Sequence, residues 1–172
     1  MGKFKSLVSD TLIFAIGNFT VKILYFILMP IYTASLSSEE FGLADLLNNT
    51  LQLVVPILTL SISDAVFRFM LEKNADKSSF LSNGFFVLLG GFVVVILGIT
   101  LISIVVQVDT YWYYFVLWYI FEALRILFAQ FTRADGKVWI FSLNGIIGAF
   151  VLLISTYFLV LRLKLGVNGY LI

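Results

Sequence analysis

Residues 80–106 read FLSNGFFVLLGGFVVVILGITLISIVV, a run of 27 positions without one charged side chain. The hydrocarbon core of a bilayer is about 30 Å thick and a helix rises about 1.5 Å per residue, so about 20 consecutive apolar residues cross it. The run exceeds that length. We therefore predict a transmembrane α-helix over Phe80–Val106.

Four more segments have the length and composition of transmembrane helices. They are Thr11–Tyr32, Phe41–Ala65, Tyr111–Phe131 and Val138–Leu161. A sixth apolar run begins at Val167 and reaches the last residue, Ile172, within a few positions. No spanning helix is so short, so we expect the chain to be a fragment of a longer membrane protein.

The composition of the whole chain agrees with a membrane location. Charged residues make up 12% of the sequence, whereas a soluble domain carries about 25%. Hydrophobic residues make up 61% and the mean hydropathy is +1.06, more apolar surface than one soluble core of this size buries. We expect an all-α, polytopic transmembrane helix bundle, with residues 1–172 forming one partial lobe.

The side chains of most enzyme centres are missing. The sequence has no histidine and no cysteine, which excludes disulfides, thiolate nucleophiles and the usual zinc sites. It also has no phosphate-binding loop, no dinucleotide-binding glycine motif and no nucleophile elbow. We expect no metal, no cofactor and no enzymatic activity, and the net charge of +1 gives no reason to expect nucleic acid as a partner.

The distribution of basic residues predicts the orientation. With the N-terminus inside, seven of them face the cytoplasm and two, Arg162 and Lys164, face the other side. The seven are Lys3, Lys5, Arg68, Lys73, Lys77, Arg133 and Lys137. Because basic residues concentrate in cytoplasmic loops, we expect a cytoplasmic N-terminus.

Polar residues recur along the second predicted span at helical spacing. They are Asp45, Asn48, Asn49, Gln52, Pro56, Thr59 and Ser63. At about 100° per residue they form one stripe, which must face protein or water because unsatisfied polar groups are costly in hydrocarbon. One interpretation is the wall of a hydrated cavity, and the other is hydrogen bonding between packed helices.

Two basic residues lie at membrane depth. Lys22 is near the middle of the first span, four residues after Asn18, and it either attracts a phosphate or pyrophosphate or pairs with an acid such as Asp45 or Glu122. Arg125 follows Glu122 by three positions. That pair either fixes the helix in its bundle or supplies a guanidinium for phosphate, with Glu122 as its partner or a proton-linked switch.

Two local signals concern how helices begin and bend. Ser37 and Glu40 have the spacing of a capping box at the start of a helix. Pro56 removes one backbone hydrogen bond inside the second span and is expected to kink it.

Three stretches resemble the polysaccharide-biosynthesis flippases of the multidrug/oligosaccharidyl-lipid/polysaccharide exporter superfamily. Met29–Gly42 resembles the first extracytoplasmic turn of that family, and Ser63–Phe69 resembles its end of helix two. Leu165–Gly169 is similar to its usual entry into helix six.

The resemblance implies two helical lobes around a central cavity, of which this chain would form part of the N-terminal one. Such proteins move undecaprenyl-pyrophosphate-linked oligosaccharides, the repeat units of O-antigen or capsule, across the bacterial cytoplasmic membrane by alternating access. Lys22 and Arg125 would then meet the pyrophosphate, and a C-terminal lobe would be needed for activity. The alternatives are a drug or cation antiporter of the same superfamily and a non-transporting structural membrane subunit.

Overall fold

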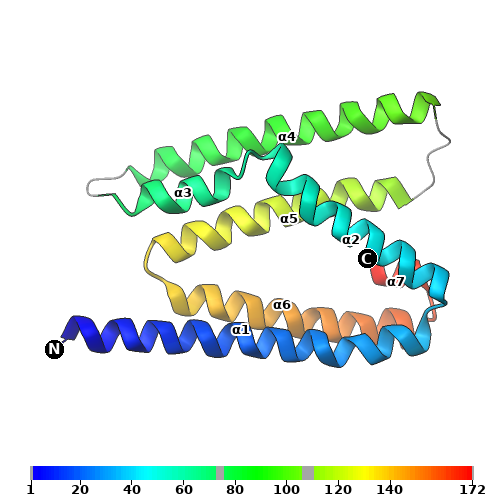
Figure 1. Ribbon diagram of the computed structural model, residues 1–172, viewed down its shortest axis with the longest axis horizontal. Helices are drawn as coiled ribbons and strands as arrows, with labels where there is room; N and C mark the ends of the chain where they lie inside the picture. Colours follow the sequence, from blue (N-terminus) through cyan, green and yellow to red (C-terminus); the bar gives the residue numbers. More distant parts are fainter. Residues whose placement is uncertain (1, 73–75, 106–110, 172) are drawn as a thin grey trace. The chain divides into compact units, whose positions relative to one another are not determined.

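The computed structural model describes residues 2–72, 76–105 and 111–171. Lys73 and Val106 lie outside these ranges, and the side chains of Lys3 and Lys5 lie outside the description as well. The described residues form helices and no strand (Figure 1). In order, the elements are α1 (Gly2–Ser35), α2 (Ser38–Leu58), α3 (Ile62–Met70), α4 (Lys77–Val105), α5 (Tyr111–Ala134), α6 (Val138–Thr156), the π-helix η1 (Tyr157–Arg162) and α7 (Val167–Leu171).

Five of these helical segments are long and apolar enough to cross a membrane, so the chain has the make-up of a multi-pass membrane protein. The predicted all-α helical bundle is confirmed. The segments are Thr11–Ser35, Ser38–Leu58, Lys77–Ile104, Trp112–Ala134 and Val138–Arg162. Helices suit this setting because they satisfy every backbone hydrogen bond within the segment.

The chain divides into two compact units, residues 1–45 with 136–172, and residues 46–135. In the first unit, α1 packs along α6 (Figure 1). The two helices approach closely at Gly17, where a Cβ atom would fall 2.7 Å from the Cβ of Ser142. A glycine at this position therefore sets the spacing of the two helices, as small residues do in membrane bundles.

In the first unit, the C-terminal end of α1 makes aromatic and polar contacts with the end of α6 and with α7. The hydroxyl groups of Tyr32 and Thr156 share a hydrogen bond of 2.8 Å, and the ring of Tyr32 meets the edge of Tyr170 at 4.8 Å. The predicted capping box is confirmed, because Glu40 N–H donates to Ser37 Oγ at 3.2 Å and Ser37 N–H donates to Glu40 Oε2 at 2.9 Å.

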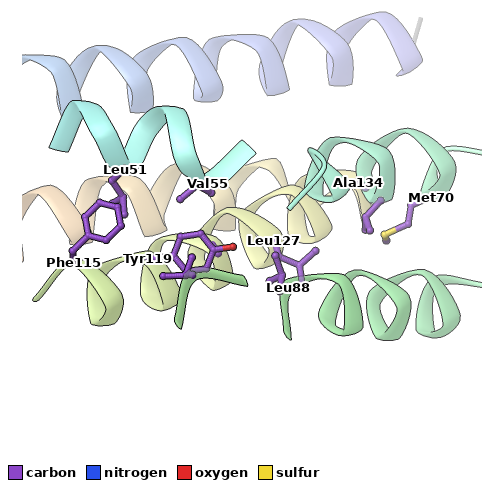
Figure 2. Close-up of a cluster of buried hydrophobic side chains, with 11 residues drawn as sticks. Leu51, Val55, Met70, Leu88, Phe115, Tyr119, Leu127 and Ala134 are labelled. Carbon is purple, nitrogen blue, oxygen red and sulfur yellow. The ribbon is translucent and has the colours of Figure 1, made fainter. Parts of the chain in front are cut away.

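The second unit buries an apolar core among α2, α3, α4 and α5 (Figure 2). The buried residues are Leu51, Val55, Val66, Met70, Leu88, Val95, Phe115, Tyr119, Ala123, Leu127 and Ala134. Gly84 lets α4 approach this core, since a Cβ there would lie 2.9 Å from Leu127 and 3.1 Å from Val66. Close packing of this kind is the main attraction between helices in a bilayer.

Several charged residues lie near the start of α4 and the end of α5. Lys77 Nζ donates to Asp135 Oδ1 at 2.5 Å, which joins the start of α4 to the residue after α5. The guanidinium of Arg133 lies 4.6 Å from the centre of the Phe67 ring. Exposed pairs of this kind add at most about 1 kcal/mol each to stability.

Candidate functional site

The second predicted span is broken rather than continuous. We expected one helix over Phe41–Ala65 with a kink at Pro56, but α2 ends at Leu58 and α3 begins at Ile62. The three residues between them form a turn. The helix is therefore disturbed near Pro56 as predicted, but the disturbance is a break rather than a kink.

The backbone explains the break. Pro56 has no N–H, so the carbonyl of Gln52 loses its helical donor. The N–H of Ser61 reaches back to the Pro56 carbonyl at 2.9 Å. Leu60 and Ser61 both have φ of 50°, a left-handed conformation that side chains with a Cβ atom adopt rarely. Strained residues persist only where the surrounding structure holds them.

The surroundings of the break fit it closely. A Cβ atom on Gly91 of α4 would lie 2.9 Å from the Leu58 carbonyl oxygen and 2.5 Å from the Tyr119 hydroxyl. Only glycine leaves room for both groups. Helix α4 therefore passes directly against the end of α2, with Tyr119 of α5 beside it.

A cleft of about 250 Å³ opens beside the break, and we call it the polar cleft. Its lining residues are Leu51, Gln52, Val55, Pro56, Thr59, Ser61, Ser63, Asp64, Glu122 and Ile126. All of them belong to the second unit. Its polar groups are two carboxylates, one amide and three hydroxyl groups, and no lysine or arginine is part of its lining.

The predicted stripe on the second span reaches this cleft only in part. Gln52, Pro56, Thr59 and Ser63 line it. Asn48 is half-buried and accepts a hydrogen bond of 3.4 Å from Gln52 Nε2. Asp45 and Asn49 are exposed and are not part of the lining. The half of the stripe toward the break therefore forms one wall of the cleft, and whether that wall is wet stays a prediction.

Glu122 and Arg125 form the intrahelical pair that their spacing predicts. Arg125 donates from Nε to Glu122 Oε2 at 2.7 Å and from Nη2 to Oε1 at 2.6 Å. The Glu122 side chain is 27% exposed and that of Arg125 is 57% exposed. The bidentate geometry, which suits a planar guanidinium, offsets the charge of the carboxylate that lines the cleft.

Asn18 and Lys22 belong to the other unit. Asn18 Nδ2 donates to the Phe14 carbonyl of its own helix at 3.0 Å, and both residues are exposed. Among the described residues, no carboxylate pairs with Lys22, so the expected alternative of a pair with Asp45 is not formed.

The sequence reasoning missed Asp64 and Gln130 as site residues. Asp64 lines the cleft, and its Oδ1 accepts a hydrogen bond of 2.8 Å from Gln130 Nε2 of α5. A signal existed, because Glu122, Ile126 and Gln130 follow one another at four-residue spacing and share a helix face. In the described part of the chain, no group of three or more acidic residues is placed to hold a metal ion.

Comparisons with known proteins give no relative. No family model matches the chain, and no curated protein or solved structure matches it. The resemblance to polysaccharide-biosynthesis flippases stays a prediction.

Proposed function

We propose that this chain is part of a transporter that moves a lipid-linked oligosaccharide across the bacterial cytoplasmic membrane. The observation that carries the proposal is the polar cleft, in which two acids and an amide lie between helices whose length and composition suit a bilayer. Ionisable residues are expensive at membrane depth and mark substrate or ion paths there. The broken helix beside the cleft is a second feature that transporters use at their binding sites.

The substrate class follows from the family resemblance and from the two intramembrane cations. An undecaprenyl-pyrophosphate carrier brings negative charge that needs counterions in a low-dielectric cavity. Lys22 lies near the middle of the first spanning segment and no described acid neutralises it. Arg125 is more than half exposed although it pairs with Glu122. Both side chains are therefore exposed enough to contact an anionic substrate.

The orientation is part of the same proposal. A cytoplasmic N-terminus puts seven basic residues inside and two outside, as the positive-inside rule favours. The lipid-linked oligosaccharide would then enter from the cytoplasmic leaflet and leave at the outer one. A C-terminal lobe would complete the path.

A second candidate is a cation-driven antiporter. The lining of the cleft favours it, because it contains the carboxylates of Asp64 and Glu122 and no basic residue. In that case the acids would govern activity, and transport would follow an ion gradient.

The test replaces the two cations in the full-length protein in its own cell. We expect Lys22→Ala and Arg125→Ala to reduce surface polysaccharide while protein abundance stays normal. Arg125→Lys should rescue only partly, because an ammonium offers a point charge where a guanidinium offers a fork. Arg68→Ala is the matched control, since Arg68 is an exposed basic residue in the last turn of α3 to which the proposal gives no role.

The outcomes separate the candidates. Normal polysaccharide in the double variant Lys22→Ala, Arg125→Ala would remove both residues from the mechanism. If abundance rather than delivery falls in Arg125→Ala, and Glu122→Ala restores it, the pair is structural. If only Asp64→Asn and Glu122→Gln lose transport activity, while Lys22→Ala and Arg125→Ala keep it, the antiporter is favoured.

A further inference from the structure

We propose that Glu40 is a charge-dependent clamp, whose ionised carboxylate holds the start of α7 against the first turn of α2 (Figure 1). All the residues that form the clamp belong to the first unit. The clamp joins two apolar segments that are far apart in the sequence, at the point where each begins. It does not depend on which solute the protein carries. Three features of this region support it.

The first feature is that one carboxylate serves two helix starts. In the capping box of α2, Glu40 Oε2 accepts the Ser37 N–H at 2.9 Å. The same carboxylate accepts the backbone N–H of Val167, the first residue of α7. A helix start favours a negative charge. Since a carboxylate has two oxygen atoms that both accept hydrogen bonds, an ionised Glu40 satisfies the two N–H groups at once.

The second feature is the room that Gly166 leaves for this carboxylate. A Cβ atom on Gly166 would overlap with Glu40 Oε1, and its three nearest neighbours would all be atoms of the Glu40 carboxylate. Gly166 has φ of 59°, a conformation that glycine adopts readily. Lys164 has φ of 51°, which is costly for a residue with a Cβ atom. Such strain persists only where surrounding contacts hold the turn, and Glu40 supplies a contact of this kind.

The third feature is that the two helix starts depend on Glu40 unequally. Helix α2 keeps a second cap, because the Glu40 N–H donates to Ser37 Oγ at 3.2 Å. Ser37 is also exposed, so water replaces the carboxylate there. Val167 is only 3% exposed, and a buried N–H that loses its acceptor is costly to leave unpaired. Removal of the carboxylate should therefore release the start of α7 and leave α2 formed.

The test is hydrogen–deuterium exchange of the full-length protein in detergent, read by mass spectrometry. We expect the backbone amides of residues 167–171 to exchange at least about 5-fold faster in Glu40→Ala than in the wild type, the factor that loss of a helix cap implies. The amides at the start of α2 should change less. Glu39→Ala is the matched control, since it removes an exposed carboxylate from the same turn and should leave both segments unchanged.

Glu40→Gln tests the role of the charge. Glutamine has nearly the same size as glutamate, but it is neutral and has one oxygen acceptor instead of two. A hydrogen bond to a neutral acceptor is also weaker than one to a carboxylate. We therefore expect exchange in residues 167–171 to lie between the wild type and Glu40→Ala.

Two glycine variants test the contact from the side of α7. Gly166→Ala places a methyl group against the carboxylate, whereas the methyl group of Gly136→Ala meets nothing within 4 Å. Both glycines have positive φ, 59° and 78°, so alanine strains the backbone at both positions. Gly166→Ala should therefore melt below Gly136→Ala. In the background of Glu40→Ala this difference should disappear, because no carboxylate is left to meet the methyl group.

Three results would overturn the clamp. Unchanged exchange of residues 167–171 in Glu40→Ala would show that other contacts hold α7. Equal acceleration in Glu39→Ala would attribute the effect to acidic charge in the turn rather than to this contact. Exchange in Glu40→Gln equal to that of the wild type would show that the charge is not required.

The test survives a folding defect. If Glu40→Ala does not fold, as judged by circular dichroism, Glu40→Gln and the pair of glycine variants decide the question. None of these measurements involves transport, so the clamp and the proposed function can fail independently of each other.

Discussion

The packing of α4 against the helix break can be tested with a pair of neighbouring glycines. A methyl group on Gly91 would lie 2.9 Å from the carbonyl oxygen of Leu58 and 2.5 Å from the Tyr119 hydroxyl. A methyl group on Gly90 would meet nothing within 4 Å. The substitutions Gly91→Ala and Gly90→Ala therefore add the same atom to the same helix at a crowded and at an open position.

The magnitude follows from two opposing terms. Overpacking a tight interior costs about 1–3 kcal/mol, and the Leu58 carbonyl is backbone that cannot rotate away. Alanine in place of a helical glycine gains about 1 kcal/mol at either position. Since that gain cancels in the comparison, Gly91→Ala should unfold about 1–3 kcal/mol more easily than Gly90→Ala.

The assay is thermal unfolding in detergent, followed by tryptophan fluorescence. In domains of 150–250 residues, 1 kcal/mol shifts the melting temperature by about 2–4 °C, so we expect Gly91→Ala to melt about 2–12 °C below Gly90→Ala. A Gly91→Ala protein that melts at or above the temperature of Gly90→Ala would show that α4 does not pack against the end of α2.

Three further predictions test other contacts. Tyr119→Phe should be neutral or slightly stabilising in the same thermal assay, because the buried hydroxyl makes no hydrogen bond among the described residues; a loss of more than about 1 kcal/mol would reveal a partner. Gly17→Ala, whose methyl group would fall 2.7 Å from a serine of α6, should melt below Gly148→Ala, where nothing lies within 4 Å; equal melting would refute the close approach of α1 and α6. A cysteine at Ser38 should react with impermeant thiol reagents from outside intact cells and one at Ser78 should not; labelling of both would refute the cytoplasmic N-terminus.

The apolar segments were predictable because length and composition alone determine them. Four of the five predicted spans agree with the observed ones to within three residues at each end, and Val138–Leu161 against Val138–Arg162 is the best match. The capping box at Ser37 and the ion pair of Glu122 were also predictable. Each depends on residues three apart in one helix, and helix geometry fixes that distance.

The break in the second span was not predictable to its full extent. Pro56 predicts the loss of one backbone hydrogen bond, but in most helices such a loss produces only a kink. The left-handed turn at Leu60 and Ser61 contains no glycine, so no local residue preference marks it. Beside the turn, Gly91 of α4 lies close to the Leu58 carbonyl oxygen, and a single-sequence pattern does not bring these two helices together.

Asp64 and Gln130 show the same limit for the site. Their hydrogen bond joins residues 66 positions apart, and the sequence gives no distance between them. The predicted stripe assumes one continuous helix from Asp45 to Ser63. The break after Leu58 changes the helical register, so this assumption does not hold for Ser63. Ser63 nevertheless lines the cleft, since α3 packs against α5.

Lys22 and Arg125 differ in their ion pairing, and this difference predicts which of them an anionic substrate would contact more favourably. Arg125 holds Glu122 through two short hydrogen bonds, so a phosphate that approaches Arg125 must compete with a carboxylate already in place. No described acid pairs with Lys22, and a phosphate there would supply the only counterion to a charge that is costly at membrane depth. An anion therefore gains more at Lys22. If the proposed function is correct, Lys22→Ala should therefore reduce surface polysaccharide more than Arg125→Ala does. The reverse order would mean that release of Glu122 from Arg125 is the step that substrate binding drives.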